Sequence, residues 1–167
     1  ASGDYICFID SDDLWDENKI KIQLEFMVKN NYKITHTSYK IIDKNNKIIG
    51  LRKARNFENI NDLLKSCDIG LSSVMLKRNI LKDDCLFPNL KTKEDFVLWL
   101  NILDRNIKIG SLNENLSSWR KLNNSLSSST FQKILDGYKV YKVYMKFNFL
   151  KSIYYLVCLS LNFLKKS

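Results

Sequence analysis

The side chains best suited to chemistry are three carboxylates that follow an apolar segment of strand length. Residues 5–9 read Tyr-Ile-Cys-Phe-Ile, and the next four positions hold Asp10, Asp12 and Asp13 with Ser11 between the first two. Five apolar residues in a row predict a central strand covered on both faces, and open α/β sheets bind ligands at the carboxyl ends of such strands. Asp10 and Asp12 can face one crevice, where close carboxylates repel each other unless a cation or a proton intervenes. Because such oxygens suit Mg²⁺ or Mn²⁺ that holds substrate phosphates, the pair predicts a metal–phosphate site.

Helix capping is the simpler explanation for acidic residues at this position. Asp13 or Asp16 could cap a helix that follows, and Asp16 and Glu17 would stabilise its first turn through the helix dipole. Capping accounts for Asp16 and Glu17, but it leaves Asp10 and Asp12 unexplained.

Two further segments extend the pattern around these carboxylates. Residues 1–23 contain A-S-G-D-Y-I-C-F-I-D-S-D-D-L-W followed by K-I and Q, residues 93–100 read K-E-D-F-V-L-W-L, and residues 119–127 carry W-R and S-L-S. In this order the segments resemble the DXD, E-D-x-x-L-W and Y-R-x(4)-S-x-S elements of family-2 glycosyltransferases, with Trp in the usual Tyr place. The resemblance covers residues 1–130 and implies an α/β fold, namely part of a GT-A fold with a mixed sheet, flanking helices and a C-terminal helical tail.

The resemblance also implies a role for each acidic residue. Asp12 would hold a Mn²⁺ or Mg²⁺ ion that bridges the donor diphosphate, and Asp10 would support the metal or the ribose. Asp95, with Glu94 beside it, would be the general base of an inverting transfer from a nucleotide-sugar donor to a glycan or lipid-linked acceptor. Arg120 would close over the diphosphate, although a surface arginine fits the sequence nearly as well. The family's habit adds the expectation of bacterial surface polysaccharide synthesis.

Glu94 and Asp95 have a purely structural interpretation as well. Without the resemblance, they are an ordinary acidic helix start stabilised by the helix dipole. Placement at a helix N-terminus is expected to keep the Asp95 carboxylate ionised, as a general base requires. His36, the single histidine, lies in a strand pattern and is expected to be structural.

The resemblance leads us to expect that the part that would bind the nucleotide base lies outside this sequence. Family members begin with βα units that hold the base and ribose, whereas this chain opens inside the family pattern at Ala1. Its five glycines form no Gly-rich phosphate loop. We therefore expect the C-terminal portion of an enzyme, inactive alone, whose first strand has an open flank that favours self-association. A non-catalytic fragment or subunit that associates with a partner is the main alternative.

A Mg²⁺-dependent phosphatase with an aspartate nucleophile is a remote alternative. Haloacid-dehalogenase phosphatases also place an Asp-x-Asp pair after an apolar strand, and their first aspartate is the nucleophile. They usually carry Thr or Val where Leu14 stands, and a Gly-Asp acidic cluster after a later strand. Asp83 and Asp84 follow Leu81-Lys82 instead, which counts against this class.

The elements that must position these residues alternate between helix and strand. Period and turn chemistry predict the following order: a helix at 16–30, a strand at 34–42, a turn at 43–47 leading to a second strand at 48–49, a short helix at 59–66 capped by Asn59 or Asn61, a strand at 72–76, a helix from Glu94 to about Leu103, and a short edge strand at 107–112.

Residues 131–167 form a second unit after the 1–130 portion, predicted to be a basic amphipathic helical tail. It carries seven lysines and one acidic residue, Asp136. One helical face is expected to hold Ile134, Tyr138, Tyr141 and Met145. The most apolar stretch, residues 153–164, falls well short of the roughly 20 residues of a spanning helix. The composition suits an anionic membrane surface, and packing on the protein itself or on a partner subunit is an equal alternative.

Net charge and cysteine content limit the possible partners and the cellular compartment of the protein. The net charge of +9 does not indicate a nucleic-acid partner, because no recognised nucleic-acid module is present and the acidic group would repel phosphates without a metal. The four cysteines form no C-x-x-C pair, which favours reduced thiols in the cytoplasm. We therefore expect a cytoplasmic protein with peripheral contact to the inner face of the cell membrane.

Overall fold

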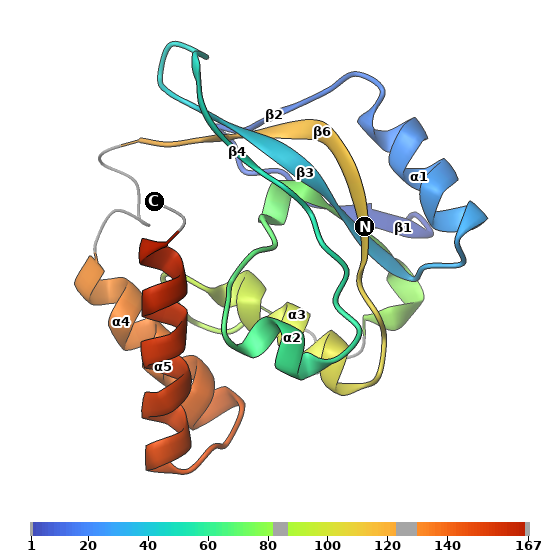
Figure 1. The fold of residues 1–167 in the computed structure, drawn as a ribbon. Helices are drawn as coiled ribbons and strands as arrows, with labels where there is room; N and C mark the ends of the chain where they lie inside the picture. The colour runs from blue at the N-terminus through green and yellow to red at the C-terminus, as the bar shows by residue number, and fades with distance from the viewer. Residues whose placement is uncertain (1, 82–86, 123–129, 166–167) are drawn as a thin grey trace.

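A computed structural model describes residues 2–81, 87–122 and 130–165 of the chain (Figure 1). The strands are β1 (Tyr5–Cys7), β2 (Leu14–Trp15), β3 (Ile34–Ile42), β4 (Ile48–Arg52), β5 (Val74–Lys77) and β6 (Gly110–Arg120). The α-helices are α1 (Lys19–Lys29), α2 (Ile60–Leu64), α3 (Glu94–Asp104), α4 (Thr130–Lys139) and α5 (Phe149–Leu164).

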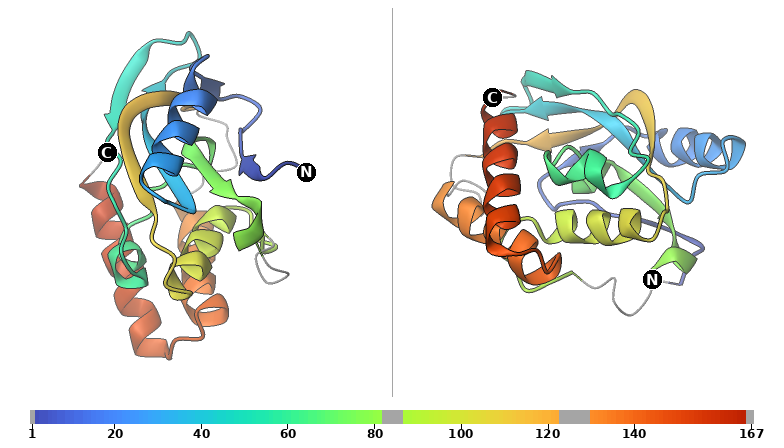
Figure 2. Two further views of the ribbon diagram at one scale, coloured as in Figure 1. Left: turned by 90° about the vertical axis from the view of Figure 1, so that its right-hand side faces the viewer. Right: turned by 60° about the horizontal axis from the view of Figure 1, so that its bottom comes forward.

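All of these strands belong to one mixed sheet. Its order is β1-β5-β3-β6-β2, and β4 pairs with β3 off this path. β3 runs parallel to β6 and antiparallel to β4 and β5. α1 packs on β3 and β6, while α2 lies beside α3. The α4–α5 pair and α1 lie at opposite ends of the molecule (Figure 2). The mixed sheet with flanking helices confirms the predicted fold class.

β1 is an edge strand within the described part of the chain. It pairs with β5 on one side and stands at the end of the strand order. Its residues are half-buried, and Ile9 beyond it is 51% exposed. The prediction of a central, doubly covered strand is therefore wrong here, because an apolar run does not reveal whether both neighbours are present. The expected open flank is confirmed.

β6 is longer and more central than the sequence predicts. The expected short edge strand at 107–112 is instead a strand of eleven residues, Gly110–Arg120, that lies between β3 and β2. Residues 113–115 are polar and exposed, so they interrupt the alternation of apolar and polar residues by which a strand is recognised in a sequence. Its parallel partner β3 supplies the hydrogen bonds that make this segment a strand.

The hairpin and the short helix lie where their local chemistry predicts them. Residues 43–47 join β3 to β4, and the Asp43 carboxylate accepts two backbone N–H groups within this turn. α2 begins after Asn59, whose side chain caps the helix while Asp62 reaches back to the Asn59 N–H.

α3 supplies the largest share of the core. Its buried residues are Phe96, Val97, Leu98, Trp99, Leu100, Ile102 and Leu103. The C-terminal helices join the same core through Val140, Tyr141 and Leu159. The Tyr141 hydroxyl donates to the Leu64 carbonyl at 2.6 Å, and the Asp136 carboxylate accepts the N–H and hydroxyl of Thr92 at 3.0 Å. The inner side of residues 130–165 therefore packs on the rest of the chain.

The single helical face predicted for Ile134, Tyr138, Tyr141 and Met145 is not formed. Ile134 is exposed, whereas Tyr141 is fully buried. A π-helical segment at Val140–Tyr144 changes the number of residues per turn, so the ideal 3.6 spacing fails across it. No described helix is long and apolar enough to cross a membrane. The division into 1–130 and 131–167 stays a prediction.

Candidate active site

The acidic loop, residues 10–13, follows β1 after two residues. The Asp13 N–H donates to the Asp10 carbonyl at 3.0 Å, which closes the turn. Asp10 is exposed, Asp12 is half-buried and Asp13 is buried. The first two carboxylates therefore face outward, as the sequence predicts, while the third points into the protein.

The buried Asp13 carboxylate anchors the acidic loop to the protein through two hydrogen bonds. Its Oδ1 accepts the Arg120 N–H at 2.9 Å, and its carboxylate also accepts the Ser72 hydroxyl. Burial raises the pKa of the Asp13 carboxyl, and these two hydrogen bonds oppose the rise. Asp13 does not cap a helix. Nor do Asp16 and Glu17 lie in a first turn, because α1 begins at Lys19.

Ser72, in the short 3-10 helix Leu71–Ser73 that precedes β5, holds the acidic loop through hydrogen bonds. Its Oγ accepts the Asp10 N–H at 3.1 Å, and its carbonyl accepts the indole N–H of Trp15 at 2.7 Å. Together with the bond to Asp13, these contacts tie one serine to both sides of the loop. No sequence signal singles out Ser72, because the contact spans 62 positions.

Arg120, at the end of β6, connects the acidic loop to the β3–β4 turn. Its Nε donates to the Asp12 carbonyl, Nη1 to the Asp43 carbonyl and Nη2 to the Asn46 side chain, each at 2.8 Å. These contacts give the guanidinium a positioning role in the structure. Its predicted contact with a diphosphate stays a prediction, and Ser125 and Ser127 of the same segment lie outside the described residues.

A polar network lies behind the loop and fixes α1. Lys19 is fully buried, and its Nζ donates to Gln23 Oε1 at 2.7 Å and lies 4.6 Å from the centroid of the Trp15 ring. Gln23 Nε2 in turn donates to Thr35 on β3 and to the Ser73 carbonyl. Burial lowers the pKa of Lys19 to about 8. Lys19 and Gln23, both part of the family pattern, therefore support the floor of the site.

Glu94 and Asp95 open α3, as predicted. The Asp95 Oδ1 accepts the Phe96 N–H at 2.7 Å, and one Glu94 carboxylate oxygen is buried without a hydrogen-bond partner among the described residues. Burial, followed by the neighbouring Glu94 charge, raises the pKa of Asp95 to about 7, against the lowering effects of the Phe96 N–H and Lys93. The expectation of a fully ionised Asp95 is wrong, because desolvation outweighs the helix terminus.

The fold brings the acidic loop and the start of α3 together. The charge on Asp10 is among those that raise the pKa of Asp95. The rings of Phe8 and Trp99, just before the loop and within α3, meet edge to face at 6.1 Å between centroids. An open cavity of about 560 Å³ adjoins the site at Glu94. Its lining residues are Leu71, Phe87, Pro88, Leu90, Lys91 and Glu94.

Asp10 and Asp12 fit a divalent cation that is shared with a substrate. The described residues contain no group of three or more His, Cys, Asp or Glu side chains that could hold a metal ion by themselves. Burial and then the Asp12 charge raise the pKa of Asp10, so a cation beside both carboxylates would relieve a real repulsion. Mg²⁺ is commonly held by one or two carboxylates plus phosphate oxygens, which matches this pair.

Comparison with known proteins gives the class. The profile of glycosyl transferase family 2 matches residues 1–84. Escherichia coli WfgD, a UDP-Glc:alpha-D-GlcNAc-diphosphoundecaprenol beta-1,3-glucosyltransferase, is 39% identical over 158 residues, which are 94% of this chain and 61% of WfgD. TuaG of Bacillus subtilis (strain 168), named for teichuronic acid biosynthesis, is 30% identical over an alignment of 170 positions, which covers 99% of this chain and 66% of TuaG. The chain thus spans about two thirds of the length of these relatives.

Solved structures agree with the fold. A crystal structure of S. aureus TarS in complex with UDP-GlcNAc superposes with a TM-score of 0.62 and 21% identity, over 86% of this chain and 42% of that chain. The chain belongs to glycosyl transferase family 2.

Proposed function

We propose that the protein is a metal-dependent, inverting glycosyltransferase in the synthesis of a bacterial surface polysaccharide. The observation that carries the proposal is that Asp10, one of the Asp10–Asp12 pair, lies within electrostatic reach of Asp95. An outward pair suits a cation, and a separate carboxylate with a pKa of about 7 suits a base. Family membership supports the same reading.

Asp95 would accept the proton in this reaction. It takes the proton of the acceptor hydroxyl while the acceptor oxygen forms a bond to the anomeric carbon, and the bond from that carbon to the diphosphate oxygen breaks. The nucleoside diphosphate leaves with the electron pair, so one displacement inverts the configuration. A positioned base contributes about 10²–10⁴-fold to the rate, and it works best with a pKa near the working pH. Glu94 supports Asp95 by raising its pKa.

Asp10 and Asp12 would bind the donor diphosphate together with Mn²⁺ or Mg²⁺. When bound, the ion would neutralise the charge that grows on the leaving diphosphate. Ser72, Asp13 and Arg120 would hold the loop in place for this contact.

The names of the relatives suggest the substrates. WfgD is named for a UDP-sugar donor and an acceptor carried on diphosphoundecaprenol. We propose a nucleotide-sugar donor and a glycan or lipid-linked acceptor for this protein too. Such an acceptor would place it in the cytoplasm, at the inner face of the membrane. The open edge of β1 supports self-association as well.

The roles are tested by transfer of labelled sugar, with the protein alone and joined to the part of WfgD that it does not span. Asp95→Asn should lower turnover about 10²–10⁴-fold and leave metal-dependent donor binding nearly intact. Asp12→Asn should lose both metal dependence and turnover, whereas Asp16→Asn outside the acidic loop should do neither.

Three results would contradict these roles. They are loss of donor binding in Asp95→Asn, normal turnover in Asp12→Asn, and the absence of transfer from every donor by the joined protein. The last result would favour a non-catalytic subunit.

A further inference from the structure

The outward side of α5 is apolar where a surface helix is normally polar. At 3.6 residues per turn, one half of the helix carries seven large side chains: Phe149, Leu150, Ile153, Tyr154, Val157, Leu161 and Leu164. Their exposed fractions run from 37% at Ile153 to 79% at Leu150. Ser160 also lies on this side, and its hydroxyl is turned back to the Leu156 carbonyl. This set of seven residues is here called the α5 face.

The buried side of the same helix accounts for its attachment to the protein. Ser152 and Leu159 are buried, and Asn162 donates to the Lys65 carbonyl at 2.9 Å. The inner side is therefore already used, and the α5 face is not needed to hold the helix in place. A contiguous apolar surface of this kind marks an interaction site.

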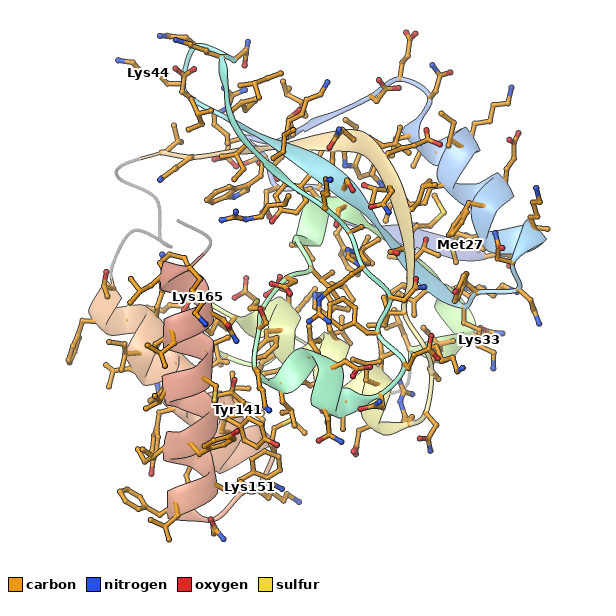
Figure 3. The ribbon with its side chains drawn as sticks, in the orientation of Figure 1. Met27, Lys33, Lys44, Tyr141, Lys151 and Lys165 are labelled. Atoms are coloured by element: carbon orange, nitrogen blue, oxygen red, sulfur yellow. The ribbon has the colours of Figure 1, made fainter. Side chains whose placement is uncertain are left out.

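Lysines surround the α5 face. Lys151 and Lys165 lie at its two ends, while Lys65 lies 5.8 Å from the Tyr154 ring centroid and Lys133 lies 5.0 Å from that of Phe163 (Figure 3). The last acidic residue of the sequence, Asp136, is buried against Thr92. α4 and α5 thus expose cations and apolar groups but no carboxylate.

This charge pattern favours an anionic bilayer over a second copy of the chain as the partner of the α5 face. A second copy of the chain on the α5 face would press one lysine rim against another, with no carboxylate on α4 or α5 to pair with them. A bilayer with anionic headgroups offers hydrocarbon for the apolar side chains and negative charge for the rim. The helix is also too short to span, so it would lie along the surface.

We propose that the α5 face is a membrane-docking surface that lays α5 flat on an anionic lipid bilayer. The inference deepens the membrane location put forward under the proposed function, and it names the surface responsible. Its test does not depend on glycosyl transfer, so either proposal can fail alone.

The test is sedimentation of the full chain with vesicles of phosphatidylcholine, alone or with roughly a third phosphatidylglycerol. We expect binding to the anionic vesicles that weakens as salt is raised above physiological levels. Leu150→Ser with Leu161→Ser should weaken it roughly tenfold or more, because these exposed leucines would no longer enter the bilayer. Lys151→Glu with Lys165→Glu should weaken it by a similar factor.

Matched variants on the β3–β4 hairpin serve as controls. Ile48→Ser with Leu51→Ser removes two apolar residues that are also exposed, and Lys44→Glu with Lys47→Glu makes the same change in charge. Neither pair should change binding by more than about twofold. Circular dichroism checks that every variant is folded.

Equal binding to neutral vesicles, or equal losses in the control variants, would overturn the proposal. So would an absence of vesicle binding, whether the chain is monomeric or forms a dimer that Leu150→Ser with Leu161→Ser dissociates in sedimentation equilibrium. The dimer result would assign the α5 face to a second copy.

Discussion

Phe8 and Trp99 meet edge to face with their ring centroids 6.1 Å apart, and this contact joins the segment between β1 and the acidic loop to the helix that carries Asp95. Both residues lie close in sequence to a carboxylate of the candidate site: Phe8 precedes Asp10 by two positions, and Trp99 follows Asp95 by four. The aromatic pair therefore packs the segment before the acidic loop directly against α3.

Truncation of Trp99 should damage the fold severely. Trp99 is fully buried, so Trp99→Ala should lower the free energy of unfolding by about 3–5 kcal/mol through lost burial and the cavity left behind. Trp99→Phe should cost about 1.5 kcal/mol or less, because it keeps a ring and removes an indole N–H that has no described partner. Urea denaturation measures both. Trp119→Ala, at a site 36% exposed, is the control, and an equal loss there would contradict the argument.

Asp95 should make stability depend on pH. Its folded pKa of about 7 lies above the ordinary 3.8, so as pH rises the unfolded chain loses this proton first and folding becomes less favourable between these values. Asp95→Asn keeps the oxygen that accepts the Phe96 N–H and removes the buried charge. It should therefore raise the free energy of unfolding at pH 8 by on the order of 1–3 kcal/mol. Below pH 4 the variant and the parent should coincide, and a difference independent of pH would refute the assignment.

Ser72 should matter for the acidic loop beyond its contribution to stability. Ser72→Ala removes the acceptor of the Asp10 N–H and the donor to Asp13, so we expect roughly tenfold weaker Mn²⁺ binding in the presence of nucleoside diphosphate. Ser73→Ala is the matched control, since Ser73 is also buried and its hydroxyl donates to the Gly70 carbonyl. Both variants should lose about 1–2 kcal/mol of stability. Titration calorimetry that finds the same Mn²⁺ affinity in both would rule out a positioning role for Ser72.

Arg120 should not tolerate lysine. A single ammonium cannot reach the three acceptors that the planar guanidinium serves, namely the Asp12 and Asp43 carbonyls and the Asn46 side chain. Arg120→Lys should cost about 1–3 kcal/mol and speed amide hydrogen exchange in both the acidic loop and residues 43–47. Arg78→Lys, at an exposed site, should stay within about 0.5 kcal/mol. Exchange that rises in one segment but not the other would show that Arg120 does not couple them.

The parts of the fold that the sequence predicted are those governed by neighbouring residues. The Asn59–Asp62 capping box and the Asp43 turn lie within a few positions of the elements they define. The full length of β6 could not be predicted from neighbouring residues, because its strand structure depends on pairing with β3, which is far away in the sequence. The role of Ser72 could not be predicted for the same reason, because its partner Asp10 is 62 positions away in the sequence.

The proximity of the candidate site residues could be predicted only in part. Spacing and family pattern singled out Asp10, Asp12, Glu94 and Asp95, whose roles stay predictions, and the fold brings Asp10 and Asp95 within electrostatic reach. The protonation of Asp95 was not readable, since it depends on how deeply the α3 terminus is buried.

The two anchors of the acidic loop have a consequence for the order of folding. Ser72 follows Asp10 by 62 positions, and Arg120 follows Asp13 by 107. During synthesis the loop therefore emerges first, while the groups that shape it emerge much later. Contacts of such long range form slowly, because a large loop must close before they are gained. The β3–β4 hairpin and α2 can form from nearby residues, but a nascent chain that has not yet reached Arg120 holds its acidic residues without a defined arrangement. The carboxylates of the acidic loop thus reach their folded arrangement only after Arg120, made more than a hundred residues later, has joined the fold.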